Sequence, residues 1–196
     1  VSVYLCHDGS GQLPMAVEGY AAFEMTSGCR SFCLIQDGGE PPVCFKYVTD
    51  FTRLIKRQDR AFETVQTAPD AACSIIFTSG TTGRAKGAEL THANYAVTCL
   101  SYSDVMGYTP DDVILVAAPL FSVLGQTMLM SAGLSAGATL VLQSRFDPER
   151  VLCAMERHNV TVFSGVPTMF YSLLHYPGLH KHDLVKIGKH WRTGIV

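Results

Sequence analysis

Apolar residues in the second half of the chain occur in short runs, separated by loops and by stretches with helical spacing. The four apolar runs are typical of buried strands: Cys73–Thr78, Val113–Ala117, Ala138–Leu142 and Val160–Phe163. Helical spacing or helix start signals occur in four other stretches: about Thr91–Met106, about Val123–Leu134, Asp147 to near His158, and the segment that Pro167 opens. Strands that alternate with helices predict βαβ units, and therefore an α/β fold with a mostly parallel sheet flanked by helices.

The first seventy residues have a weaker pattern. Ser31–Ile35 predicts a strand, and Thr49–Phe62 predicts a helix. Asp37–Pro42 is a turn cluster, and Glu63–Asp70 is a polar connector. We therefore divide the sequence into a poorly defined upstream part, residues 1–70, and a regular part, residues 71–196.

The segment from Val113 to Ser144 contains no charged residue, so a membrane span is the alternative to a buried core. Pro119 and three glycines interrupt the run, and polar side chains are spread through it, among them Gln126, Thr127, Ser131, Ser135 and Thr139. No basic flanks and no aromatic belt bracket it. We therefore expect two buried strands with a helix between them and no transmembrane span.

Composition narrows the class of protein. Of the 196 residues, 47% are hydrophobic and 16% are charged, and the net charge is −2. This balance excludes a disordered chain, a coiled coil and a nucleic-acid-binding tail. The seven cysteines are scattered, odd in number and without a C-x-x-C pair, so we expect an intracellular, cytoplasmic protein. The chain opens at Val1 without a signal-like start, and we expect it to be a piece of a longer protein.

A loop rich in glycine and hydroxyl residues follows the first apolar run. Thr78–Gly87 packs four hydroxyls and three glycines into ten residues and carries one lysine, Lys86. Glycines allow backbone N–H groups to turn inward, hydroxyls donate to phosphate oxygens, and a lysine adds a compact positive charge. The pattern predicts a polyphosphate-binding loop, and the alternative is a flexible surface turn without a ligand. It is not a Walker A loop, because Lys86 stands three places after Gly83 and is followed by Gly87.

The segment from Phe77 to Gly87 resembles the phosphate-binding signature of the adenylate-forming (AMP-binding) enzymes, which include acyl-CoA synthetases, luciferases and peptide-synthetase adenylation domains. Four further segments extend the resemblance: Glu89–Asn94, Pro119–Phe121, Phe146–Glu149 and Val162–Met169. It covers roughly Asp70 onward and is closest to fatty-acid-type CoA ligases. The resemblance implies a fragment of the large N-terminal domain, with residues 71–196 in the AMP-binding core and the rest of the same enzyme chain, including its C-terminal domain, elsewhere.

The resemblance implies a two-step reaction. ATP and a carboxylate, here a medium- or long-chain fatty acid, would give an acyl-adenylate and pyrophosphate, and coenzyme A would then take the acyl group as a thioester. Mg²⁺ would assist. The implied β- and γ-phosphate ligands are Thr78, Ser79, Gly80, Thr81, Thr82, Gly83 and Lys86, of which Lys86 is the catalytic candidate. The implied acyl-site residues are Ser122, Gly165, Val166, Pro167 and Thr168.

The sequence departs from the family pattern at several points. Ala85 stands where the family loop usually has proline, and Ser122 stands where it usually has histidine. Trp191–Val196 resembles the strand before the adenine loop, and the Mg²⁺-binding acidic motif, the ribose aspartate and the C-terminal catalytic lysine do not follow. We expect this fragment alone to be inactive. Two alternatives stay open: an adenylation module that loads a carrier protein, and a truncated, non-catalytic nucleotide- or acyl-binding protein.

Other candidate sites in the sequence have ordinary explanations. His175, His180, His182 and His190 lie close together, but no Cys or paired carboxylate joins them, so we favour a solvated linker over a metal site. Cys29 and Cys33 lack metal-ligand spacing and are read as buried small hydrophobes. Ser122 has no G-x-S-x-G context and is not a hydrolase nucleophile.

Overall fold

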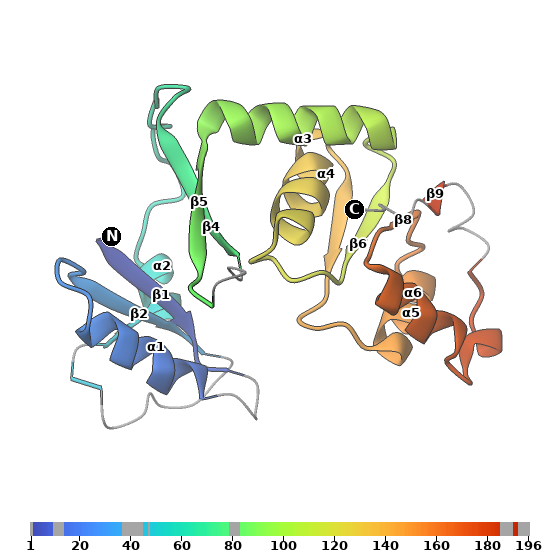
Figure 1. The fold of residues 1–196 in the computed structure, drawn as a ribbon, viewed down its shortest axis with the longest axis horizontal. Helices are drawn as coiled ribbons and strands as arrows, with labels where there is room; N and C mark the ends of the chain where they lie inside the picture. The colour runs from blue at the N-terminus through green and yellow to red at the C-terminus, as the bar shows by residue number, and fades with distance from the viewer. Residues whose placement is uncertain are drawn as a thin grey trace. The chain divides into compact units, whose positions relative to one another are not determined.

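The computed structural model of the chain describes residues 2–9, 14–36, 45–46, 48–78, 83–184 and 190–191. It divides into two compact units, Val1–Val65 and Gln66–Val196 (Figure 1).

The first unit is a small parallel sheet with a helix packed on it. Its elements are β1 (Val3–His7), α1 (Met15–Glu24), β2 (Ser31–Ile35), β3 (Val48–Asp50) and α2 (Phe51–Lys56), and the strand order is β1-β2-β3. The core contains Tyr20 of α1 and Phe32 of β2, whose rings meet edge to face at 5.2 Å. An edge-to-face pair at this distance stabilises the helix against the sheet beyond the area that it buries.

The prediction of β2 is confirmed, and the prediction of a helix over Thr49–Phe62 is wrong at both ends. Asp50 has extended backbone and accepts a hydrogen bond from the Arg53 N–H, so it caps a helix that starts only at Phe51. The helix ends at Lys56, because the following exposed residues have no core to pack against. The turn cluster at Asp37–Pro42 lies outside the described residues. Sequence analysis missed β1, α1 and β3.

The second unit begins with a β-hairpin and a long helix. β4 (Ala72–Thr78) and β5 (Lys86–Thr91) pair antiparallel, and α3 (His92–Met106) follows β5 without a loop. Thr91 ends the strand and caps the helix: its hydroxyl accepts from the Asn94 N–H, while the Asn94 side chain accepts from the Thr91 N–H. This reciprocal capping box fixes the start of α3 at the residue that the sequence indicated.

A four-stranded parallel sheet follows. Its strands are β6 (Val113–Val116), β7 (Thr139–Leu142), β8 (Val162–Phe163) and β9 (His190–Trp191), in the order β7-β6-β8-β9. The connections carry the helical segments, namely η1 (Leu124–Ser131), α4 (Ala132–Ser135), α5 (Pro148–Arg157), α6 (Pro167–Leu174) and η2 (Leu179–Lys181). The α/β prediction is confirmed. None of the helices in the described ranges is long and apolar enough to cross a membrane.

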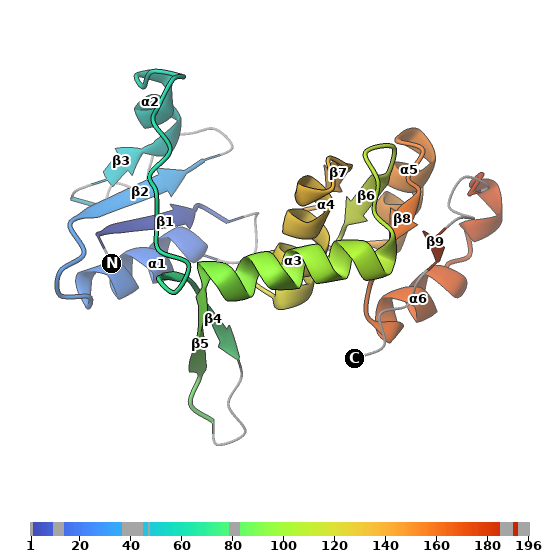
Figure 2. The ribbon, with the colours of Figure 1, turned by 90° about the horizontal axis from the view of Figure 1, so that it is seen from above.

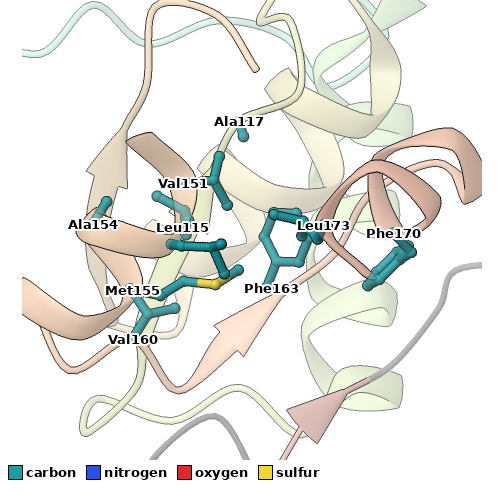
Figure 3. Close-up of a cluster of buried hydrophobic side chains, with 10 residues drawn as sticks. Leu115, Ala117, Val151, Ala154, Met155, Val160, Phe163, Phe170 and Leu173 are labelled. Carbon is teal, nitrogen blue, oxygen red and sulfur yellow. The ribbon is translucent and has the colours of Figure 1, made fainter. Parts of the chain in front are cut away.

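Helices cover both faces of this sheet. On one face, Leu115 and Phe163 pack against Met155 of α5 and Phe170 of α6 (Figure 3). On the other, Ile114 and Val116 pack against α3 and the η1–α4 segment, and Figure 2 shows α3 running along that side. Successive residues of β6 thus enter opposite cores, which explains why the strand is apolar throughout. Fully burying each of these side chains contributes about 1.5–3 kcal/mol.

Two helix predictions show how local signals work. Asp147 accepts from the Arg150 N–H and Pro148 occupies the first position of α5, as predicted. The predicted helix at Val123–Leu134 is helical over Leu124–Ser135, but its first eight residues have π-helical hydrogen bonding. For example, the Ala132 N–H donates to the Thr127 carbonyl, five residues back. Such wide turns occur where tertiary packing overrides the ideal helix, often near functional sites.

Candidate functional site

The predicted phosphate loop closes the β4–β5 hairpin. Thr78 and Lys86 are paired residues at the open end of the ladder, and the Thr78 hydroxyl donates to the Lys86 carbonyl at 3.5 Å. Gly83 has a φ of +82°, in the left-handed region that suits glycine. Ser79, Gly80, Thr81 and Thr82 lie outside the described residues. The chain therefore brings Thr78 and Lys86 together where the two strands of the hairpin end and begin.

The charges of this turn face solvent. Lys86 and Arg84 are both exposed. Two cations next to Gly83 are therefore accessible to an anion. A lysine presents a compact point charge and an arginine a planar fork, and both chemistries bind phosphate oxygens. Among the described residues of the turn, Arg84 and Lys86 are thus the cations that are exposed to a possible anionic ligand.

The strand that leads into the turn is not the buried strand that the sequence predicted. Ile76 is 7% exposed, but Ile75 is 56% and Phe77 is 69% exposed. Among the described strands, β4 and β5 pair only with each other, so helices do not cover both faces of the hairpin as they do in the four-stranded sheet. Gly87 allows the Ile75 side chain to lie across β5, since a Cβ there would stand 2.8 Å from Ile75 Cγ2.

The predicted acyl-site residues lie at one edge of the four-stranded sheet. β6 and β8 are adjacent and parallel, with Leu115 opposite Phe163, so both carboxyl ends meet the same edge. The chain leaves β6 through η1 and α4 toward β7, and it leaves β8 through α6 in the opposite direction, toward β9 (Figure 2). Ligands of open α/β sheets bind in the crevice at such a switch point. Ser122 follows β6, and Gly165–Thr168 follow β8.

Ser122 closes the turn that precedes η1. Its hydroxyl donates to the Pro119 carbonyl at 2.7 Å and accepts from the Gly125 N–H at 3.2 Å. A Cβ on Gly125 would collide with the Pro119 carbonyl oxygen, so the backbone of Gly125 lies directly against the backbone of Pro119. The two hydrogen bonds of the Ser122 hydroxyl thus link both sides of the turn between β6 and η1.

The segment after β8 forms the first turn of α6. Gly165 is buried, and a Cβ there would stand 2.9 Å from Met169 Sδ. Val166 and Pro167 start the helix, and Val166, Pro167 and Thr168 are all exposed. The Met169 N–H donates to the Val166 carbonyl at 2.9 Å, which fixes the direction of the turn. These exposed side chains are accessible to a ligand at the edge of the sheet.

A cavity of about 230 Å³ connects the hairpin with the turn after β6. Residues of β4, of the Pro119–Ser122 turn and of the first turn of η1 line it: Ser74, Ile75, Ile76, Phe77, Leu120, Phe121 and Gln126. Sequence analysis did not select Ser74 or Gln126. The one available signal was that Gln126 is the sole amide side chain between Val113 and Leu142.

Two tyrosines, the half-buried Tyr102 and the buried Tyr108, belong to the core between α3 and the four-stranded sheet. Tyr102 and Tyr108 meet edge to face at 6.0 Å, and burial raises the pKa of both hydroxyls above the usual value near 10. Both phenols therefore stay protonated at neutral pH and are poor candidates for a general base.

In the described ranges, no group of three or more His, Cys, Asp or Glu side chains is placed to hold a metal ion. His182 Nδ1 lies 3.0 Å from Glu156 Oε2, whereas His175 Nδ1 lies 2.9 Å from the Tyr171 carbonyl oxygen. These histidines thus have separate partners. The described residues therefore contain no cluster of this kind for the Mg²⁺ that the resemblance implies.

Comparisons with known proteins identify the family to which the chain belongs. The family model described as "AMP-binding enzyme" matches residues 29–193. A feruloyl-CoA synthase of Amycolatopsis sp. is 41% identical over 115 residues, 59% of this chain and 23% of that protein. A 2-succinylbenzoate–CoA ligase of Bacillus pumilus (strain SAFR-032) is 39% identical over 120 residues, 61% of this chain and 24% of that protein. The chain therefore spans about a quarter of the length of these curated relatives.

Solved structures give the same result for the fold. The crystal structure of ATP-bound MatB from Rhodopseudomonas palustris superposes with a TM-score of 0.73 and 30% sequence identity. The superposition covers 90% of this chain and 32% of that protein. The fold of this chain is therefore similar to part of the fold of that ATP-bound protein.

Proposed function

The chain belongs to the AMP-binding enzyme family, and from that membership we propose that it forms part of an ATP-dependent acyl-CoA synthetase. The observation that carries the proposal is the hairpin turn, where Thr78 and Lys86 meet at the ends of a loop bent at Gly83. The switch point of the neighbouring sheet supplies a second ligand surface, after β6 and β8.

The proposed reaction has two steps. A carboxylate oxygen attacks the α-phosphorus of ATP, the bond to the β-phosphate breaks, and an acyl-adenylate and pyrophosphate result. The thiol of coenzyme A then attacks the acyl carbonyl and displaces AMP. Lys86 and the hydroxyls of the turn hold the β- and γ-phosphates and stabilise the charge that develops on the departing pyrophosphate. Catalysis by these residues is positioning and charge stabilisation, with no covalent intermediate on the chain.

The substrate is a small-molecule carboxylate. The fatty acid implied by the sequence resemblance stays a prediction, to be tested beside ring-containing acids, since feruloyl and 2-succinylbenzoyl groups appear in the names of two relatives. The exposed residues Val166–Thr168 and the cavity beside β4 are the surfaces proposed to meet the acyl group.

A reducing, cytoplasmic location fits this function. The cysteines in the described ranges are free thiols, and burial raises the pKa of the Cys6 and Cys99 thiols, which keeps both protonated and unreactive. We retain the cytoplasm as the proposed compartment.

The test is carboxylate-dependent exchange of labelled pyrophosphate into ATP, measured on the intact protein. Lys86→Ala should slow exchange by at least tenfold while far-ultraviolet circular dichroism stays unchanged, since Lys86 is exposed and supports no core contact. Lys181→Ala, another exposed lysine remote in sequence from the turn, is the matched control and should leave the rate unchanged. Equal rates for Lys86→Ala and the unmodified protein would remove the phosphate-binding role of the turn.

The second step of the reaction distinguishes the synthetase from the two alternative functions. An acyl-CoA synthetase forms a thioester with free coenzyme A, whereas an adenylation module requires a carrier protein. A non-catalytic binding protein shows neither exchange nor thioester while still binding nucleotide.

A further inference from the structure

The cavity beside β4 has a mixed lining that is unusual for a plain hydrocarbon site. Five of its seven lining side chains are apolar, namely Ile75, Ile76, Phe77, Leu120 and Phe121. Ile76 forms a buried wall, 7% exposed, and Phe121 stands at the mouth, 82% exposed. The two polar side chains are Ser74 and Gln126, both half-buried. A few placed polar groups in an apolar wall are what fixes the orientation of a bound small molecule.

The backbone holds Gln126 in a set position. Its N–H donates to the Ser122 carbonyl at 2.9 Å, and the preceding Gly125 is pressed against the Pro119 backbone. The Gln126 side-chain amide has no hydrogen-bond partner among the described residues, although an amide offers two donors and one acceptor oxygen. A half-buried amide at a cavity wall gains when a ligand supplies the missing partner.

The cavity size restricts the ligand. A dry cavity of about 150 Å³ is enough to hold benzene. The cavity beside β4, at about 230 Å³, is therefore large enough for one substituted ring. A long alkyl chain would have to leave through the mouth at Phe121, where contact with the wall is lost.

Resting on the proposed function, we propose that this cavity binds the body of the carboxylic acid substrate, and that Gln126 selects a ring-sized acid bearing a hydrogen-bonding oxygen. The amide N–H₂ donates to a hydroxyl, methoxy or keto oxygen of the acid, while Ile76 and Leu120 contact the ring. Gln126 is thus a specificity residue, one turn beyond Ser122 and across the cavity from β4. The apolar wall alone would discriminate weakly, because small changes in apolar contact are worth little in selectivity.

The test compares three acids in pyrophosphate exchange catalysed by the intact protein. Ferulic acid carries a hydroxyl and a methoxy group on its ring, and cinnamic acid has the same carbon skeleton without these groups. Palmitic acid is a long-chain alkyl acid. We expect kcat/KM to fall in that order. Gln126→Met keeps the length of the side chain but removes its donors, and it should lower the ferulate-to-cinnamate ratio about tenfold, which corresponds to about 1.4 kcal/mol. Gln143→Met makes the same change at a glutamine outside the cavity, where the amide donates to the Arg150 carbonyl, and should leave the ratio unchanged.

The outcomes separate the two claims. A ratio that is the same in Gln126→Met as in the unmodified protein overturns the role of Gln126, and a preference for palmitate overturns the cavity as the acyl site. Both results leave the proposed adenylation of a carboxylic acid standing, since exchange is observed. Absence of exchange with every acid, in a protein that binds nucleotide, overturns the function and this inference with it.

Discussion

Gly125 is the position where a single methyl group should disturb both stability and the proposed site. A Cβ there would lie 2.7 Å from the Pro119 carbonyl carbon and 2.9 Å from the Ala118 oxygen. These are backbone atoms of the turn that leaves β6, so they cannot rotate aside as a side chain can. Gly125→Ala must therefore shift the turn that carries Leu120 and Phe121, which line the cavity.

Gly133 in α4 provides a matched comparison. A Cβ there would lie 2.7 Å from Ile114 Cδ1 and 2.9 Å from Leu140 Cδ2, both of which are ends of flexible side chains. Overpacking costs roughly 1–3 kcal/mol, and replacing a helical glycine by alanine stabilises by about 1 kcal/mol. We expect Gly125→Ala to lose about 2 kcal/mol or more, and Gly133→Ala to lose about 1 kcal/mol or less.

Urea unfolding of the intact protein, followed by circular dichroism, measures the difference. The Gly125→Ala protein should unfold at the lower urea concentration and also lose exchange activity, because the turn between β6 and η1 moves. Equal stability of Gly125→Ala and Gly133→Ala would contradict the close contact between Gly125 and the backbone of Ala118 and Pro119.

Two further predictions concern local stability. Thr91→Ala removes the hydroxyl that caps α3 and should cost about 1 kcal/mol in urea unfolding, whereas Thr98→Ala, within the same helix, should cost less than half as much; equal losses would contradict the capping role. Burial raises the pKa of Tyr108, so the folded state keeps a proton that the unfolded state releases near pH 10; stability is full below pH 10 and falls as pH rises further. Tyr108→Phe should therefore flatten the loss of stability between pH 10 and 11, and an unchanged slope in that range would show that this hydroxyl is not buried.

The sheet and several helix starts could be predicted because their signals are local. The Asp147–Pro148 pair by itself specifies the cap and the first turn of a helix. The apolar run at Val113–Ala117 is short and lies between turn residues, so its own sequence indicates a buried strand. β5 was missed because most of Lys86–Thr91 is exposed and shows no apolar alternation. Its strand geometry comes from pairing with β4, a partner that the pattern within β5 does not reveal.

The candidate site also contains residues that local sequence signals reveal and one residue that only the tertiary structure reveals. Thr78, Gly83 and Lys86 belong to one continuous motif, so sequence analysis selected them. Gln126 becomes a candidate only when β4 and the first turn of η1 face each other across a cavity. Nothing in the local sequence indicates that apposition. The π-helical start of η1 has the same origin, since it accompanies close packing of Gly125 on the Pro119 turn.

The fate of the carboxylate oxygen tests the central claim most directly. The acid is labelled with ¹⁸O in its carboxyl group and turned over by the intact protein with ATP and coenzyme A. Adenylate formation transfers one labelled oxygen to AMP and none to pyrophosphate, because the carboxylate attacks the α-phosphorus. Mass spectrometry of the products should therefore find the label in AMP. Label in inorganic phosphate, or unlabelled AMP beside a labelled thioester, would contradict the account.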